Sequence, residues 1–262
     1  MMLYDEYVAT LPIERGDRLW ISSELVQLAF LFKRKGERFD ASKLIDAFQT
    51  KVGEEGTLLI PTFCFDFSNI QYYDYKNSKG TAGALGNVAL KRDDFARTKH
   101  PMHSFAVWGK DKQILYEMNN RHAFGEDSPF RYCKDNHVKQ VIIGTDYVHA
   151  LTFVHYVETV CNVPYRFPKQ FTGTYITEEG EKQTRTYDYA ARKLEINPEE
   201  RINRIGVVME KRGVAHRYTF HDHLTLVIDL TDSYDIIKDD IVNNQCRNIY
   251  DFNIPREEVF GV

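Results

Sequence analysis

The fold is decided by residues 17–61, which read DRLWISSELVQLAFLFKRKGERFDASKLIDAFQTKVGEEGTLLIP. Residues 17–23 predict a short strand ending in two serines, and residues 56–61 predict a second, buried strand. Between them, apolar residues recur twice at helical spacing, first from Leu25 up to Gly36, then from a cap at Asp40 or Ser42 to a stop at Gly53. Two strands joined through helices form a parallel crossover. We therefore expect an α/β fold with a mixed or parallel central sheet and flanking helices.

The rest of the chain repeats this pattern less clearly. Further strands are expected over residues 104–108, 139–144, 172–177 and 224–230, and helices over 112–119 and from Thr152 to residue 160. Residues 66–84 are rich in Tyr, Asn, Ser and Gly, which is typical of a long functional loop. No composition break suggests a linker, so we expect one domain over residues 1–262.

Composition excludes several classes of protein. The 43% hydrophobic and 13% aromatic content is too high for a disordered chain. A net charge of −4, from 34 basic against 38 acidic side chains, gives no broad basic field for nucleic acid. The longest apolar stretch, residues 25–32, is far short of the ~20 residues that span a bilayer. With no secretory signal at residues 1–10 and four widely spaced cysteines, we expect a cytoplasmic protein with reduced thiols.

The most informative segment is residues 144–158, which read GTDYVHALTFVHYVE. Asp146 comes just after a predicted strand, where sites form in α/β sheets. His155 and Glu158 are three residues apart and share one face of a helix. Together these residues suit a general base and the carboxylates that orient it and stabilise its imidazolium form. The alternative is an ordinary helix start with a surface histidine and a solvated glutamate.

Two further segments carry polar groups suited to binding. Residues 97–109, RTKHPMHSFAVWG, place cations, histidines and a serine before an apolar strand, a cluster that can hold phosphate or polarise a carbonyl. Ser22 and Ser23 precede a helix whose first N–H groups can face an anion or a thioester oxygen. A polar turn in the first case and simple helix capping in the second remain alternatives.

Three other patterns are weaker. The glycines at 80, 83 and 86 have the spacing GxxGxxG, which matches no nucleotide-binding loop and indicates tight turns. His221 and His223 would face one side of a strand, as would suit a metal, but no third ligand can be named, so we expect no metal. Cys64 lies between aromatic residues, which predicts an inert buried thiol rather than a hydrolase nucleophile.

Taken together and in this order, the segments resemble the aminoglycoside 3-N-acetyltransferase family. Residues 21–25 and 52–63 are similar to its opening, and residues 97–105 to its RSxHPxxS stretch. The family's SP element and its GxxxxxxTxxHxxE-type element, with the run VPYR after them, correspond to residues 127–130, 143–158 and 163–166. The resemblance covers residues 10–175 and fades over 176–262.

The resemblance implies an acetyltransferase fold distinct from the GNAT fold. It implies transfer of an acetyl or other short acyl group from coenzyme A to the amino group of an amino sugar, without a covalent enzyme intermediate. His155 becomes the candidate general base, with Asp146 and Glu158 as its partners and Ser104 beside the thioester. The residues that the resemblance places around the coenzyme are Ser22, Ser23, Thr62, Arg97, Lys99, His100 and Ser104.

The chain also departs from the family pattern. Thr98 stands where the family commonly has serine, and residues 83–86 lack the usual glutamate. For the acceptor we expect residues 66–79 to contribute stacking tyrosines and two acids: Tyr72, Tyr73, Tyr75, Asp66 and Asp74. Such a loop suits an aminoglycoside or a nucleotide-linked amino sugar for a surface polysaccharide. A noncatalytic sugar- or coenzyme-binding relative, a metal-dependent hydrolase and a homo-oligomer also stay open.

Overall fold

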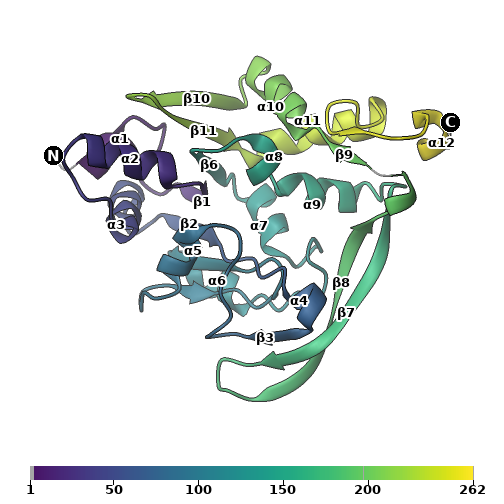
Figure 1. Cartoon of the computed structure of the whole chain (residues 1–262), viewed down its shortest axis with the longest axis horizontal. Helices are drawn as coiled ribbons and strands as arrows, with labels where there is room; N and C mark the ends of the chain where they lie inside the picture. Colours follow the sequence, from purple (N-terminus) through teal and green to yellow (C-terminus); the bar gives the residue numbers. More distant parts are fainter. Residues whose placement is uncertain (1–2, 197, 262) are drawn as a thin grey trace.

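The computed structural model describes residues 3–196 and 198–261, and its centre is a seven-stranded mixed sheet (Figure 1). The strand order is β10-β11-β6-β1-β2-β5-β4. Strands β6, β1 and β2 are parallel, and the other neighbours are antiparallel. The strands are β1 (Arg18–Ser23), β2 (Thr57–Pro61), β4 (Ala96–Arg97), β5 (Phe105–Gly109), β6 (Lys139–Ile143), β10 (Ala215–Phe220) and β11 (His223–Asp229). The mixed α/β sheet expected from the sequence is confirmed.

The crossover predicted over residues 17–61 is present. Strands β1 and β2 pair in parallel, and helices α2 (Val26–Arg34) and α3 (Ala41–Val52) lie between them in sequence. The Asp40 carboxylate caps α3 by accepting a hydrogen bond from the Ser42 N–H at 2.9 Å. Gly53 ends α3 with φ +68°, a backbone conformation that residues other than glycine adopt only with strain.

Helices cover both faces of the sheet. Leu19 and Ile21 of β1 pack against one set of helices and Trp20 against another, because side chains alternate along a strand. The first face is covered by α1 (Leu3–Ala9), α2, α3 and α5 (Ala84–Ala89). The second is covered by α6 (Lys112–Glu117), α7 (Pro129–Asp135), α8 (Tyr147–Ala150), α9 (Phe153–Val160), α10 (Ile202–Lys211) and α11 (Leu230–Asn243).

A second sheet runs along the flank of the molecule (Figure 1). It consists of the long hairpin β7 (Arg166–Ile176) and β8 (Lys182–Arg192), with β3 (Tyr72–Asp74) parallel to β7. Helix α4 (Phe67–Ile70) packs on β7. The expectation of a loop throughout residues 66–84 is therefore wrong over α4 and β3.

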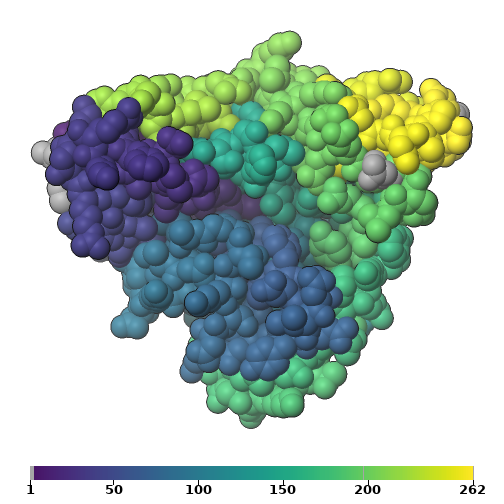
Figure 2. Space-filling view, viewed as in Figure 1, coloured from purple at the N-terminus to yellow at the C-terminus, as the bar shows by residue number. Residues whose placement is uncertain are grey.

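The C-terminal residues pair with an earlier segment of the chain. Strand β12 (Tyr250–Asp251) pairs with β9 (Glu199–Glu200), next to a turn of 3-10 helix, η1 (Leu194–Ile196). Helix α12 (Arg256–Phe260) follows, and this end of the chain lies opposite the N-terminal helices (Figure 2). Among the residues that the structure describes, none forms a helix both long and apolar enough to span a bilayer.

Candidate active site

A cleft of about 420 Å³ opens where the parallel strands end. Ser22 and Ser23 enter it from the end of β1, Phe63 follows β2, and Thr145 follows β6. Thr152 lines it at the start of α9. Sites in α/β proteins form at the carboxyl ends of parallel strands, and the cleft has this position.

Close packing of a glycine-rich turn shapes one side of this cleft. A Cβ atom on Gly86 would lie 2.1 Å from the Pro61 carbonyl oxygen, and one on Gly80 would lie 2.9 Å from the Thr62 Cα. Gly80 and Gly86 can therefore lie against the end of β2 because they lack side chains. Gly83, between them, lines the cleft.

A second cavity of about 570 Å³ adjoins the first, since both are lined by Thr145 and His149. Its charged lining residues are Arg34, Asp146 and Asp222. Arg34 forms an ion pair with Asp222 at 2.8 Å. The two hollows together offer room for a ligand longer than either one holds.

Helix α9 presents a histidine–glutamate pair one turn beyond the cleft. The His155 Nδ1 atom lies 2.8 Å from Glu158 Oε2, as the three-residue spacing predicts. The His155 side chain is 16% exposed, whereas that of Glu158 is completely buried. Within residues 3–196 and 198–261, only the Nδ1 atom of the His155 ring has a hydrogen-bond partner, so Nε2 is free to meet a ligand.

Tyr165 and Arg166, at the start of the β7–β8 hairpin, hold Glu158 in its charged form. The Tyr165 hydroxyl donates to Glu158 Oε1 at 2.9 Å. The Arg166 Nε atom lies 2.8 Å from Oε2, close enough for an ion pair although not aligned as a hydrogen bond. Burial alone would raise the pKa of Glu158, but the Arg166 charge and the hydrogen bonds from His155 and Tyr165 lower it to about 2.

The two contacts of His155 Nδ1 correspond to different tautomers of the ring. The Nδ1 atom also lies 2.9 Å from Arg166 Nη2, and it cannot both donate to Glu158 and accept from Arg166. With the proton on Nδ1, His155 donates a hydrogen bond to Glu158, which can only accept, and Nε2 keeps its lone pair. In that tautomer the pair has the arrangement of a general base with a buried orienting carboxylate.

The acid stability of the protein tests the charge on Glu158. Its pKa is about 2 in the folded protein and 4.5 in the unfolded chain, so the stabilisation is complete above pH 4.5 and is lost as the pH falls toward 2. We expect the unfolding free energy of the wild type to fall by up to about 1.4 kcal/mol per pH unit more than that of Glu158→Gln in this window. Urea unfolding at several pH values measures both slopes.

A matched control for this experiment is Glu117→Gln, which changes an exposed glutamate that accepts a hydrogen bond from the Gln113 side chain. It should keep the acid slope of the wild type. Parallel curves for the wild type and Glu158→Gln would contradict the ionised, buried Glu158.

Asp146 is not a partner of His155, which corrects the sequence-based expectation. Its carboxylate accepts from the His149 N–H at 3.3 Å and lies 2.5 Å from His149 Nδ1. The Asn203 side chain donates to it at 2.9 Å. The short helix α8 separates β6 from α9 and turns Asp146 toward its own first turn, where it is the N-cap.

Arg97, Thr62 and Ser104 lie together, but inside the protein rather than on the cleft. Arg97 is 3% exposed and donates to Ser104 Oγ at 3.1 Å and to the Thr62 carbonyl at 2.8 Å. The Thr62 and Ser104 hydroxyls are 2.8 Å apart. These three residues hydrogen-bond to one another, so the expected positions of Arg97 beside a phosphate and of Ser104 beside a thioester are wrong. Their hydrogen bonds instead stabilise the chain just after β2.

His100 and Lys99 also lie away from the cleft. Burial, assisted by the nearby His122, lowers the pKa of His100 to about 3, so its ring is neutral. The Lys99 ammonium lies 5.0 Å above the Tyr116 ring, in a separate cavity of about 150 Å³. The structure therefore does not place either residue beside Ser22 and Ser23.

The expected stacking surface of tyrosines is mostly buried. Tyr73 and Tyr75 are 0% and 7% exposed, because both belong to the cluster between β3 and the long hairpin. Tyr72 points outward and is 45% exposed. Asp74 accepts from the Asn77 N–H at 2.9 Å and so stabilises a turn, while Asp66 lies at the surface. Burial of the two tyrosines removes them as stacking partners.

The histidine pair considered for a metal is separated. His221 occupies the exposed turn between β10 and β11 with φ +54°, whereas His223 is buried on β11. They do not share a strand, so the expected same-side arrangement is wrong. All four cysteines are free thiols, and burial raises the pKa of Cys64 as its aromatic neighbours predict.

Sequence reasoning gave no role to Tyr165 and Arg166, or to Tyr250, whose hydroxyl accepts from Arg166 Nη2 at 3.0 Å. The VPYR run contains the first two, and its position shortly after the histidine segment was the available signal. Tyr250 lies 84 residues from Arg166 and had no such signal.

Comparison with known proteins places these observations in a family. A family model described as aminoglycoside 3-N-acetyltransferase matches residues 35–241. The SPbeta prophage-derived aminoglycoside N(3')-acetyltransferase-like protein YokD of Bacillus subtilis is 24% identical, and the match covers 93% of each chain. Its crystal structure superposes with a TM-score of 0.75 at 20% identity, covering 92% of this chain and 98% of YokD.

Two liganded acetyltransferase structures have the same fold. AAC-IIIb in a binary complex with CoASH superposes with a TM-score of 0.75 at 15% identity, covering 92% of this chain and 95% of that one. AAC-VIa bound to sisomicin gives 0.76 at 16% identity, covering 92% and 96%.

Proposed function

Because this chain belongs to the aminoglycoside 3-N-acetyltransferase family, we propose that it transfers an acetyl group from acetyl-CoA to an amino group of an amino sugar. One observation carries the proposal: His155 and the buried, ionised Glu158 stand one helical turn from a cleft at the strand ends. A base with a free Nε2 atom is what removal of a proton from an attacking amine requires.

We place the pantetheine arm of coenzyme A in the cleft of about 420 Å³. Its lining combines apolar side chains such as Phe63 and Ala150 with the hydroxyls of Ser22 and Ser23, which suits a chain of methylenes and amides. The CoASH complex of AAC-IIIb supports a coenzyme A thioester as the donor.

The proposed reaction is a direct transfer. As the amine nitrogen attacks the thioester carbonyl, His155 Nε2 takes the proton that the nitrogen loses, and Glu158 stabilises the imidazolium that forms. When the carbon–sulfur bond breaks, the same proton passes to the thiolate, which leaves an amide and free coenzyme A. Ser104 takes no part in this proposal, because its hydroxyl is buried against Thr62 and Arg97.

For the acceptor we propose an aminoglycoside-type amino sugar. AAC-VIa has been solved with sisomicin, and AAC(3)-IVa with a gentamicin. On this chain, the carboxylates of Asp146 and Asp222 line the cavity next to the cleft and suit an acceptor with several ammonium groups. A nucleotide-linked amino sugar would bring a pyrophosphate toward these acids.

The test mixes purified protein with acetyl-CoA, a thiol reporter and a panel that contains sisomicin, gentamicin and a nucleotide-linked amino sugar. We expect release of free coenzyme A with at least one aminoglycoside. Release with only the nucleotide-linked sugar would overturn the acceptor, and no release above the acceptor-free background would overturn the proposed activity. Binding of coenzyme A without release would identify a noncatalytic relative.

A further inference from the structure

Ser22 presents a hydroxyl group to the cleft from the end of β1. The residue is 9% exposed and lines the cleft of about 420 Å³. We propose that this hydroxyl donates a hydrogen bond to a carbonyl oxygen of the acyl-pantetheine chain, and that Gln140 of β6 is the positioning residue that orients it. This inference rests on the proposed function, because the acyl-pantetheine chain belongs to the proposed donor substrate.

Ser22 and Gln140 lie on the same face of the sheet. Ser22 shares this face with Trp20, because alternate residues of a strand point to one side. Gln140 is the partner of Trp20 in the ladder between β1 and β6, and residues paired in this way also point to one side. Trp20 packs in the cluster that includes residues of α8 and α9. Both polar side chains are therefore on the face that α8 and α9 cover.

The direction of the hydrogen bond between these two residues follows from a third group. Gln140 Nε2 lies 2.8 Å from the Ala150 carbonyl oxygen and 3.1 Å from Ser22 Oγ. A carbonyl oxygen can only accept, so the NH₂ end of the Gln140 amide, and not its oxygen, faces Ala150. That NH₂ group has two hydrogens, one for each neighbour. Ser22 Oγ is therefore the acceptor in this bond, and its own proton is not used.

The proton of Ser22 is left for a ligand. Within residues 3–196 and 198–261, Gln140 is the only hydrogen-bond partner of the Ser22 hydroxyl. The serine does not cap the helix that follows, because the first N–H of α2, that of Val26, donates to the Glu24 carboxylate at 3.0 Å. A hydroxyl that accepts from the protein and borders a cleft is arranged to donate into that cleft. The acyl-pantetheine chain offers carbonyl oxygens as acceptors, in its thioester and in its amides.

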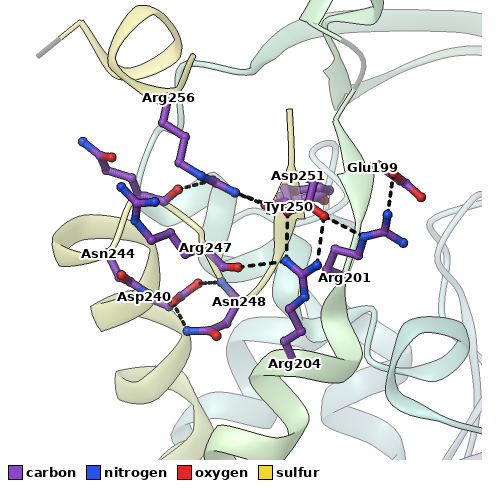
Figure 3. Close-up of polar contacts among 11 residues, drawn as sticks. Glu199, Arg201, Arg204, Asp240, Asn244, Arg247, Asn248, Tyr250, Asp251 and Arg256 are labelled. Carbon is purple, nitrogen blue, oxygen red and sulfur yellow. Dashed lines mark hydrogen bonds and ion pairs between the residues drawn. The ribbon is translucent and has the colours of Figure 1, made fainter. Parts of the chain in front are cut away.

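The amide of Gln140 is costly to the fold. Gln140 is 0% exposed in an interior strand, and in the part of the chain that the structure describes its Oε1 atom has no hydrogen-bond partner. By contrast, both oxygens of the buried Asp240 are paired: Oδ1 accepts from the side chains of Asn244 and Asn248, and Oδ2 from the Asn248 N–H (Figure 3). An unpaired buried oxygen destabilises the folded state. An apolar residue at position 140 would avoid this cost, so the amide is better explained by what its NH₂ group holds.

The first test is Ser22→Ala, which removes the donor, with binding measured by isothermal titration. If the bond is to the thioester oxygen, acetyl-CoA binds about fivefold more weakly and kcat falls about tenfold or more, whereas coenzyme A, which lacks that oxygen, binds as before. If the bond is to an amide oxygen, acetyl-CoA and coenzyme A both bind about fivefold more weakly and kcat is retained. Unchanged binding of both ligands together with an unchanged kcat would overturn the role of the hydroxyl.

The second test is Gln140→Glu, which keeps the size of the side chain and replaces its NH₂ group by oxygen. The carboxyl group has at most one proton, which the Ala150 carbonyl takes because it can only accept. The same oxygen then accepts the Ser22 proton and withholds it from the ligand. We therefore expect the changes seen in Ser22→Ala, and less than about twofold further change when the two substitutions are combined.

A Gln140→Glu variant that behaves like the wild type would overturn the positioning role. So would a loss that persists at full size in the Ser22→Ala background, since such a loss would not act through Ser22. If Gln140→Glu does not fold, Gln140→Met takes its place, and its loss must likewise disappear when Ser22 is already alanine.

The matched control is Thr225→Val, which removes a buried hydroxyl of β11 that pairs with Tyr7 at 2.7 Å on the other face of the sheet. It should lower stability but keep kcat and the binding of both ligands. If the wild type acetylates no acceptor, the proposed function fails, but the titrations still decide the roles of Ser22 and Gln140. A wild type that binds neither acetyl-CoA nor coenzyme A would overturn both.

Discussion

His155→Ala should lower kcat for acetyl transfer by a factor on the order of 10²–10⁴, while acetyl-CoA still binds. The loss of kcat is expected because the variant removes Nε2, the proton acceptor that the His155–Glu158 pair offers. Binding is expected to persist because other residues line the cleft. Steady-state kinetics with the thiol reporter measure the loss, and isothermal titration with coenzyme A measures binding.

The control for this variant is His216→Ala, which removes an exposed histidine of β10 outside the cleft. It should retain wild-type kcat. If His155→Ala turned over within about tenfold of the wild type, general-base catalysis by His155 would be wrong.

Arg166→Met should destabilise the fold by about 3–5 kcal/mol at neutral pH, since it leaves the Glu158 carboxylate buried without its cation. Both side chains are almost entirely inaccessible, at 4% and 0% exposure. Burial then dominates, and the pKa of Glu158 rises above its ordinary value instead of falling to about 2. Urea unfolding at pH 7 measures the loss.

The pH dependence of this loss gives a sharper test. In the variant, the raised pKa of Glu158 stabilises the folded protein at low pH, and this stabilisation is lost as the pH rises. In the wild type, the lowered pKa of Glu158 stabilises the folded protein at higher pH, and this stabilisation is lost as the pH falls. The difference between the two proteins should therefore shrink as the pH is lowered from 7 toward 4.

Two further variants separate this mechanism from a general packing defect. Adding Glu158→Gln to Arg166→Met should recover part of the stability by removing the unpaired charge. Arg217→Met, which breaks an exposed pair with Glu210, should cost no more than about 1 kcal/mol. An Arg166→Met variant as stable as the wild type would contradict the buried ion pair.

The parts of the fold that follow from local patterns were predictable. The crossover over residues 17–61 depends on strand and helix periods and on caps such as Asp40 and Gly53, all of which are local. The His155–Glu158 contact follows from three-residue spacing on one helix. Such features can be read from a short window of sequence because their partners lie within it.

The remaining features depend on pairing between distant segments. Strand β8 is polar along much of its length and is a strand because it pairs with β7. Tyr73 is buried because β3 joins that hairpin about a hundred residues later in the chain. Asp146 is near His155 in sequence, yet the turn of α8 directs it elsewhere. Charge and spacing alone could not distinguish these outcomes.

The central claim is that this chain acetylates an amino sugar with His155 as the base. The most direct measurement is mass spectrometry of an amino-sugar panel after incubation with acetyl-CoA and either the wild type or His155→Ala. The wild type should add the mass of one acetyl group to at least one amino sugar, and His155→Ala should not do so in the same time. An acetylated product formed equally by both proteins, or by neither, would contradict the claim.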